Sequence, residues 1–215
     1  MAFRFIPEMA VGGDYYDVRA NGHDQLAILL ADVSGHGMSG AFVTGLIKTA
    51  FELAYNPVDP PHRFMTLLNR LLSANTPEDS FAAIMFAVYD AGRQNLQYVV
   101  AGHAPVPFLV RSSGEIELLD GSGGMITGVD PEADYVYEQV KLNPGDLLVM
   151  CTDGITDAAN GLGEFYGRVA LEALLRDNAG RTADEVVNAI DQALRDHTRD
   201  EPQTDDQTVI VMQAL

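Results

Sequence analysis

The chain has 215 residues, enough for one domain with a sizeable core, and its 47% hydrophobic and 20% charged residues are typical of a globular protein. It contains 31 aspartates and glutamates against 13 lysines and arginines, a formal net charge of −18. This field repels a phosphate backbone and attracts divalent cations and basic protein surfaces, although solubility alone also accounts for such a charge. We therefore expect no nucleic-acid partner.

Cys151 is the single cysteine, so an intramolecular disulfide and a cluster of thiolate metal ligands are both excluded. It lies in the apolar run LLVMC, where a buried and unreactive thiol is expected. No apolar stretch approaches the roughly 20 residues needed to span a bilayer, and the N-terminal MAFRFIPEM lacks a signal-peptide pattern. We expect no membrane insertion and a cytoplasmic location.

The N-terminal part of the chain is predicted to contain a strand almost at its first residue and a buried strand over 27–33. From 41 to 54, apolar residues recur at helical spacing. A second helix is predicted over 61–74, because Pro61 suits the first turn of a helix.

The middle of the chain is predicted to be rich in strands, because short apolar or alternating runs are separated by turn residues. These strands are expected over 81–89, 96–101, 107–111, 114–120 and 135–142. A turn then leads into a second buried strand, over 147–152.

The C-terminal part is predicted to form two helices, near 164–177 and 183–197, before a β-rich run over 208–214. Thr182 and Glu185 match a capping box at the start of the second helix. Strands and helices thus occur in blocks, which favours an α+β class with mostly antiparallel sheets over an alternating βαβ fold. A layered sandwich with helices covering paired sheets is expected, and no linker or repeat divides the chain.

Aspartates occur at four places where an apolar run meets a loop. Turn capping accounts for an aspartate at any one strand end, but strand ends can converge at one sheet edge, where carboxylates repel unless a cation lies between them. Oxygen ligands without a histidine or cysteine set favour Mg²⁺ or Mn²⁺ over Zn²⁺, and two such ions can activate a water and bind phosphoryl oxygens. The residues are Asp14 and Asp17 in GGDYYD, Asp32 in LLADVSGHG, Asp153 and Asp157 in VMCTDGITDA, and Asp205 and Asp206 in QTDDQTVIVM.

The stretch DVSGHGMSG (32–40) also suggests other chemistry. A Walker A loop needs a lysine directly after its glycines, and none occurs before Lys48. GHGMSG has the G-x-G-x-x-G spacing, but no convincing βαβ unit follows it. Ser34 and His36 lack the G-x-S-x-G elbow of a hydrolase nucleophile, so we expect His36 to be a hydrogen-bonding or substrate-side residue.

Taken in order, GGDYYD, DVSGHG, AGHAP, TDGITDA and TDDQTVIV resemble the bacterial PPM-type (protein phosphatase 2C-like) serine/threonine phosphatases. The SpoIIE/RsbU branch, which acts in sigma-factor partner switching, is the most similar, and the resemblance extends over nearly the whole chain. It implies a four-layer αββα sandwich with two Mn²⁺ or Mg²⁺ ions at one end of the paired sheets.

The resemblance also implies a role for each acidic motif. Asp32 would bridge both metals, and the backbone carbonyl of Val33 would complete one coordination sphere. Asp153 and Asp205 would hold the second metal, Asp14 would support the first directly or through water, and Asp32 and Asp153 would act in catalysis through metal-activated water. The remaining candidates are two lower-ranked acids, Asp17 and Asp206, and two loop-shaping glycines, Gly13 and Gly35.

The implied activity is metal-dependent hydrolysis of a phosphoserine or phosphothreonine in a protein, typically a phosphorylated anti-sigma-factor antagonist of the STAS type. An upstream regulatory or sensor domain is implied as well, so that 1–215 would be the catalytic part of a longer protein. Regulation by homodimerisation is also implied. Arg4 is the only basic residue before the first acidic motif, and no phosphate-binding arginine is assigned. Two alternatives remain: a catalytically inactive module of the same fold that sequesters a regulatory partner, and a metal-dependent nucleotide-processing enzyme.

Overall fold

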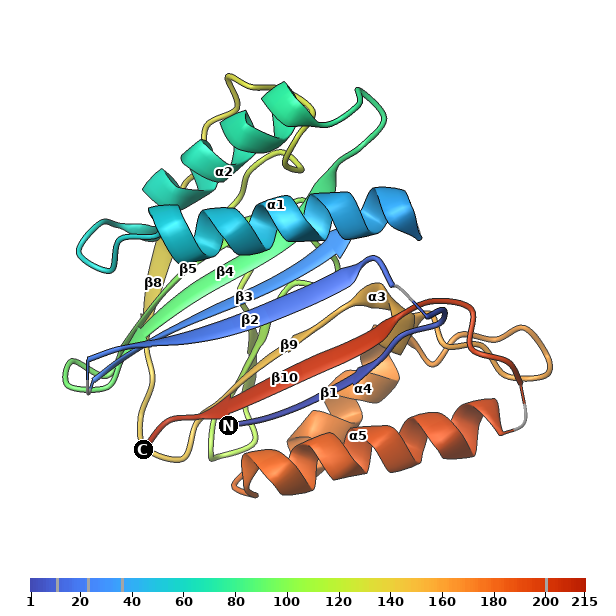
Figure 1. Ribbon diagram of the computed structural model, residues 1–215. Coiled ribbons are helices and arrows are strands. Elements are labelled where there is room, and N and C mark those ends of the chain that lie inside the picture. The colour runs from blue at the N-terminus through green and yellow to red at the C-terminus, as the bar shows by residue number, and fades with distance from the viewer. Residues whose placement is uncertain (11, 23, 36, 200) are drawn as a thin grey trace. The chain divides into compact units, whose positions relative to one another are not determined.

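The computed structural model describes residues 1–10, 12–22, 24–35, 37–199 and 201–215. Within these residues the chain divides into two compact units. The first unit contains Met1–Glu8, Pro105–Leu119 and Leu142–Leu215, and the second contains Met9–Ala104 and Asp120–Lys141. Each unit consists of one antiparallel five-stranded sheet with helices packed against one face (Figure 1).

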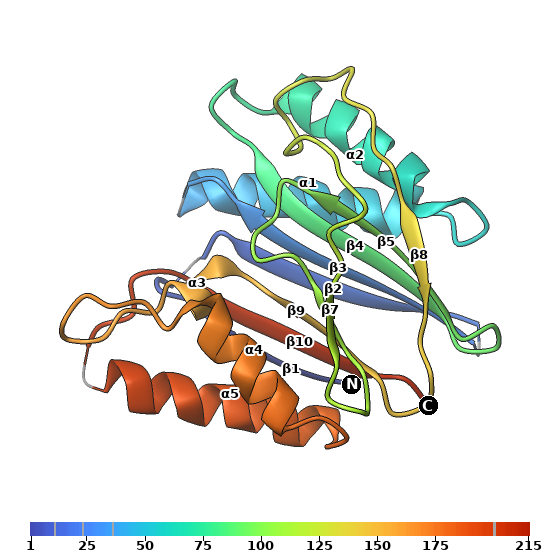
Figure 2. The same cartoon turned by 180° about the vertical axis from the view of Figure 1, so that it is seen from behind.

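The sheet of the second unit has the order β2-β3-β4-β5-β8, and every neighbouring pair is antiparallel. Two helices, α1 (Met38–Ala54) and α2 (Pro61–Asn75), cover one face, and β8 forms one edge of the sheet (Figure 2). The strands are β2 (Asp14–Asn21), β3 (Gln25–Val33), β4 (Ala82–Asp90), β5 (Asn95–Ala101) and β8 (Glu138–Lys141).

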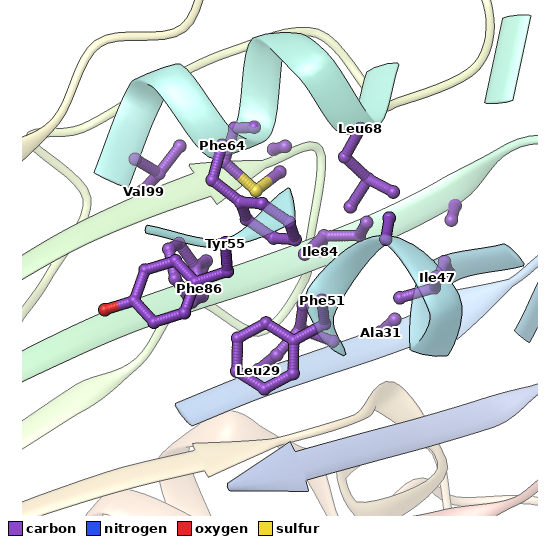
Figure 3. Packing of buried hydrophobic residues seen from close by; sticks show 14 of the residues in the cluster. Leu29, Ala31, Ile47, Phe51, Tyr55, Phe64, Leu68, Ile84, Phe86 and Val99 are labelled. Atoms are coloured by element: carbon purple, nitrogen blue, oxygen red, sulfur yellow. The ribbon is translucent and has the colours of Figure 1, made fainter. Parts of the chain in front are cut away.

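The core of the second unit forms between this sheet and the two helices. Alternate residues of β3, among them Leu29 and Ala31, face Ile47 and Phe51 of α1 (Figure 3). The ring of Phe51 also meets that of Phe86 on β4 edge to face, with centroids 5.9 Å apart. Since side chains alternate along a strand, the residues between these core positions point to the other face of the sheet.

The sheet of the first unit has the order β1-β10-β9-β6-β7. Its core is formed by strand residues and by α4 (Gly167–Asp177) and α5 (Ala183–Thr198), with the short helix α3 (Asp153–Thr156) directly after β9. The strands are β1 (Ala2–Ile6), β6 (Phe108–Val110), β7 (Ile116–Leu118), β9 (Leu147–Cys151) and β10 (Gln207–Gln213).

The α+β class and the mostly antiparallel sheets are confirmed, as is the capping box, in which Thr182 and Glu185 bond each other's backbone N–H groups. Two elements were not predicted: β2, whose sequence DYYDVRAN carries no apolar run, and α3, which has only four residues. Helix α1 begins before residue 41, and α4 begins after 164, because Ala159 and Phe165 form an isolated β-bridge there. Strand β8 is shorter than the predicted 135–142. Within the described ranges, no helix has the length and hydropathy to cross a bilayer.

Candidate metal centre

Asp14 and Asp32 lie directly opposite each other where β2 and β3 pair. Directly opposed residues of an antiparallel pair point to the same face, with Cβ atoms about 4.5–5.5 Å apart. Asp32 lies between Ala31 and Val33, which both belong to the helix-side core, so the two carboxylates point to the face away from the helices. Asp14 is only 8% exposed. The second unit therefore holds two neighbouring carboxylates at one end of its sheet.

The backbone carbonyls of the adjoining residues pack closely beside this pair of carboxylates. The Val33 N–H donates to the carbonyl of Gly13 at 3.3 Å. A Cβ atom at Gly13 would lie 2.7 Å from the Val33 oxygen and 3.2 Å from the Gly35 oxygen, closer than van der Waals contact allows. Gly35 itself has a φ of +87°, in the region that favours glycine. A side chain at Gly13 would thus displace the carbonyl of Val33, whereas Gly35 is required by its backbone conformation.

Asp17 lies on the other face of β2 from Asp14, because the two residues are three positions apart and side chains alternate along a strand. Its carboxylate accepts hydrogen bonds from the Tyr15 hydroxyl at 2.7 Å and the Lys48 Nζ at 2.8 Å. Burial alone would raise the pKa of Asp17, but the bonds from Lys48, Tyr15 and the Val18 N–H lower it below its usual range. The structure therefore ties Asp17 to α1 and does not bring it to Asp14.

In the first unit, Asp153 begins α3 at the end of β9, and Asp205 lies in the loop before β10, the strand that pairs with β9. Burial raises the pKa of Asp153, and the negative charges of Asp205 and Asp157 raise it further. The contribution of Asp205 and Asp157 to this raised pKa is repulsion between carboxylates, which a cation would offset. A Cβ atom at Gly154 would overlap the carbonyl oxygen of Asp206, so the two acid-bearing segments are in close backbone contact.

Two further acids of these motifs have hydrogen-bonding roles. Asp206 is buried, 5% exposed, and its Oδ1 accepts the N–H of Glu8 at 2.7 Å. The Oδ1 of Asp157, at the C-terminal end of α3, accepts the Thr156 hydroxyl at 3.1 Å.

The residues of the other hypotheses are engaged elsewhere. The Ser34 hydroxyl accepts the N–H of Phe81 at 2.8 Å and donates to the Asp79 carbonyl at 3.4 Å, so it fastens the loop after β3 to the start of β4. Arg4 forms an ion pair with Asp191 of α5. His36 lies outside the described residues.

The donor set of each unit fits a hard divalent cation. Over the part of the chain that the structure describes, no group of three or more histidine, cysteine, aspartate or glutamate side chains is placed to hold a metal ion. Instead each unit presents a pair of predicted ligands, Asp14 with Asp32 and Asp153 with Asp205. Carboxylate and carbonyl oxygens are the ligands that Mg²⁺ and Mn²⁺ prefer.

A cavity of about 870 Å³ lies in the second unit near Asn21 and Gln25, at the opposite end of the β2–β3 pair from Asp14 and Asp32. The one acid in its lining, Asp59, accepts a hydrogen bond from Arg63 at 3.0 Å. This cavity is therefore separate from the predicted ligands.

Comparison of the fold identifies its class. The structure matches the SiaA-PP2C domain of Pseudomonas aeruginosa with a TM-score of 0.87 and 25% identity, over 99% of this chain and 85% of that one. It matches the phosphatase domain of SpoIIE from Bacillus subtilis with a TM-score of 0.80 and 19% identity, over 98% of this chain and 61% of that one. The two antiparallel sheets with their helices are thus the fold of PP2C-type phosphatase domains.

The family follows from the sequence. The family model described as "Stage II sporulation protein E (SpoIIE)" matches residues 22–215, and the chain belongs to this family. It is 30% identical to Protein IcfG of Synechocystis sp. over 236 residues, covering 97% of this chain and 37% of IcfG. It is 27% identical to phosphoserine phosphatase RsbU of Bacillus subtilis over 208 residues, covering 96% of this chain and 61% of RsbU. The chain therefore spans about a third to three fifths of the length of these relatives, and the predicted family is confirmed.

Proposed function

We propose that residues 1–215 form the phosphatase domain of a longer regulatory protein and hydrolyse phosphoserine or phosphothreonine in a protein substrate with the help of divalent cations. Membership of the SpoIIE family supports this, as do the names of two relatives, the phosphoserine phosphatases RsbU and RsbP. The observation that carries the proposal is the pairing of Asp14 with Asp32 beside the carbonyl of Val33. Two opposed carboxylates beside a backbone carbonyl that packs against Gly13 are suited to binding a cation. They point away from the core between the sheet and the helices.

The proposed ligands divide between two Mn²⁺ or Mg²⁺ ions. Asp32 would bind both ions, Asp14 and the Val33 carbonyl the first, and Asp153 and Asp205 the second. Ions bound there would lower the pKa of water and offset charge on the phosphoryl oxygens. The chain's own part is to supply oxygen donors on a fixed backbone and an excess of negative charge around Asp153, which favours cation binding.

The substrate and partners belong to the proposal as well. By analogy with the sigma-factor branch of the family, the substrate is a phosphorylated anti-sigma-factor antagonist of the STAS type. An upstream regulatory or sensor domain, a cytoplasmic location and homodimerisation are proposed on the same ground. The low share of IcfG and RsbU that this chain covers supports the existence of further domains in such proteins.

Hydrolysis of p-nitrophenyl phosphate and of a phosphoserine peptide with Mn²⁺ tests the proposal. We expect Asp32→Ala to reduce kcat by at least about 100-fold, since it removes a ligand of both ions. Asp177→Asn, an exposed acid at the end of α4, is the matched control and should retain wild-type rates. Equal rates for wild type and Asp32→Ala would refute the ligand assignment.

The alternatives predict different results with the same samples. An inactive module that sequesters a partner would hydrolyse neither substrate with Mn²⁺ present. A nucleotide-processing enzyme would act on nucleoside phosphates in preference to the phosphopeptide. The phosphatase proposal requires Mn²⁺ binding in calorimetry together with turnover of the phosphopeptide.

A further inference from the structure

The loop before β10 is fastened to the N-terminal segment of the chain by side-chain hydrogen bonds. The carboxylate of Asp206 accepts the N–H of Glu8 at 2.7 Å. The amide of Gln203 donates both to the carbonyl of Ile6 at 2.8 Å and to the carbonyl of Asp205 at 2.7 Å. Gln203 therefore bridges the end of β1 and the backbone of a predicted metal ligand.

The same loop is held on its other side by β9 and α3. The hydroxyl of Thr152, between β9 and α3, donates to the carbonyl of Asp206 at 3.5 Å and accepts the N–H of Thr208, at the start of β10, at 3.1 Å. Gly154 leaves no space for a side chain against Asp206. The segment carrying Asp205 is thus held between α3 and the residues that follow β1.

The two consecutive acids of this loop differ in exposure and in hydrogen bonding. Asp205 is exposed, and its Oδ1 accepts the N–H of Asp206 at 2.8 Å, which limits the rotation of its side chain. Asp206 is buried and turned toward the backbone of Glu8. The exposed carboxylate is accessible to a cation, whereas the buried one bonds to the protein.

We propose that Asp206 and Gln203 are positioning residues, which fix the loop between Glu8 and α3 so that the carboxylate of Asp205 is held in one orientation for the divalent cation. The inference rests on the proposed function, since it takes Asp205 as a ligand. It assigns Asp206, an alternative metal ligand on sequence grounds, to the support of its neighbour. It also gives the segment after β1 a part in the site.

Four variants separate a ligand from a positioning residue: Asp205→Asn, Asp206→Asn, Asp206→Ala and Gln203→Ala. Asparagine keeps an oxygen that can accept the Glu8 N–H, so the Mn²⁺ affinity of Asp206→Asn should be within about twofold of wild type. Loss of a hydrogen bond that supports a metal ligand typically lowers metal affinity about 10–100-fold. Asp206→Ala and Gln203→Ala should therefore weaken Mn²⁺ binding about tenfold or more, and Asp205→Asn at least as much. Gln213→Ala is the control, because its amide also donates to a backbone carbonyl, that of Arg181 at 3.2 Å, away from the loop.

Two measurements on the purified protein are needed: titration calorimetry with Mn²⁺, without substrate, and amide hydrogen exchange at Glu8 by NMR. We expect exchange at Glu8 to speed up in Asp206→Ala and to stay slow in Asp206→Asn and Gln213→Ala. If Asp206→Ala does not fold, Gln203→Ala still tests the inference, because Gln203 is partly exposed.

The outcomes distinguish this inference from the proposed function. Loss of Mn²⁺ binding in Asp206→Asn as large as in Asp205→Asn would make Asp206 a ligand and overturn the inference. Unchanged Mn²⁺ affinity in both Asp206→Ala and Gln203→Ala would overturn it too, while leaving the proposed function intact. A wild-type protein that binds no Mn²⁺ would instead refute the proposed function itself.

Discussion

Replacement of Gly13 by alanine tests whether the backbone around Val33 has to be where the structure places it. The added Cβ would lie 2.7 Å from the Val33 oxygen and 3.2 Å from the Gly35 oxygen. An ordinary contact between these atoms needs at least about 3.4 Å, so one strand must move by several tenths of an ångström. Displacements of about 1 Å at a reacting centre cost about 100-fold in rate, or about 2.7 kcal/mol at 1.36 kcal/mol per tenfold.

We therefore expect Gly13→Ala to lower kcat/KM by about 10–100-fold with Mn²⁺ and to weaken Mn²⁺ binding, while the protein still folds. Phosphopeptide hydrolysis, calorimetry and a thermal melt measure the three quantities. Gly45→Ala is the matched control, because nothing lies within 4 Å of its added Cβ on α1 and alanine favours a helix. A folded Gly13→Ala protein with wild-type Mn²⁺ affinity and kcat/KM would refute the reasoning.

Two further predictions concern buried or half-buried acids of the first unit. The Asp146 side chain is 1% exposed, and burial alone would raise its pKa. Arg111 at 2.9 Å and the N–H groups of Asn143 and Ser112 instead lower this pKa. The ionised Asp146 therefore stabilises the fold above its unfolded-state pKa, and this stability is lost as the pH falls through its folded-state pKa. Asp146→Asn should lower the free energy of unfolding by about 3 kcal/mol at pH 7 in urea titrations, with a gap that narrows below about pH 4; a pH-independent gap would contradict this. Asp153 has a raised pKa, so its negative charge destabilises the metal-free protein as the pH rises. Asp153→Asn should therefore raise the Tm of the metal-free protein at pH 7 and abolish the increase in Tm that Mn²⁺ gives the wild type. A lower Tm of the metal-free variant would refute this prediction.

Much of the fold could be predicted because the longer helices and the buried strands each have a clear hydrophobic period. Helix α5 combines such a period with a capping box, and its observed start matches the prediction. Strand β2 was missed because its sequence DYYDVRAN contains no apolar run, and its place in the sheet depends on pairing with β3 rather than on local propensity. The position of α4 depends on a bridge between Ala159 and Phe165 that has no signature in either residue type.

The pairing of Asp14 with Asp32 had a signal in the sequence that could have been used. Turn-forming residues precede the apolar run of β3 in the sequence, and Asn21 pairs with Gln25 where β2 meets β3. Because register is set by the turn, counting outward from that pair brings Asp14 opposite Asp32. The different roles of Asp205 and Asp206 had no such signal, since the N–H that binds Asp206 comes from Glu8, at the other end of the chain.

The same structural device accompanies the predicted ligands in both units. Gly13 precedes Asp14 and leaves room for the carbonyl of Val33, and Gly154 follows Asp153 and leaves room for the carbonyl of Asp206. In each case a strand-end acid is placed by close backbone contact with the neighbouring acid-bearing segment, without a side chain between them. Backbone contact of this kind has few alternative arrangements, whereas long side chains have many rotamers. Gly13 and Gly154 are thus explained by the positions of the carboxylates beside them.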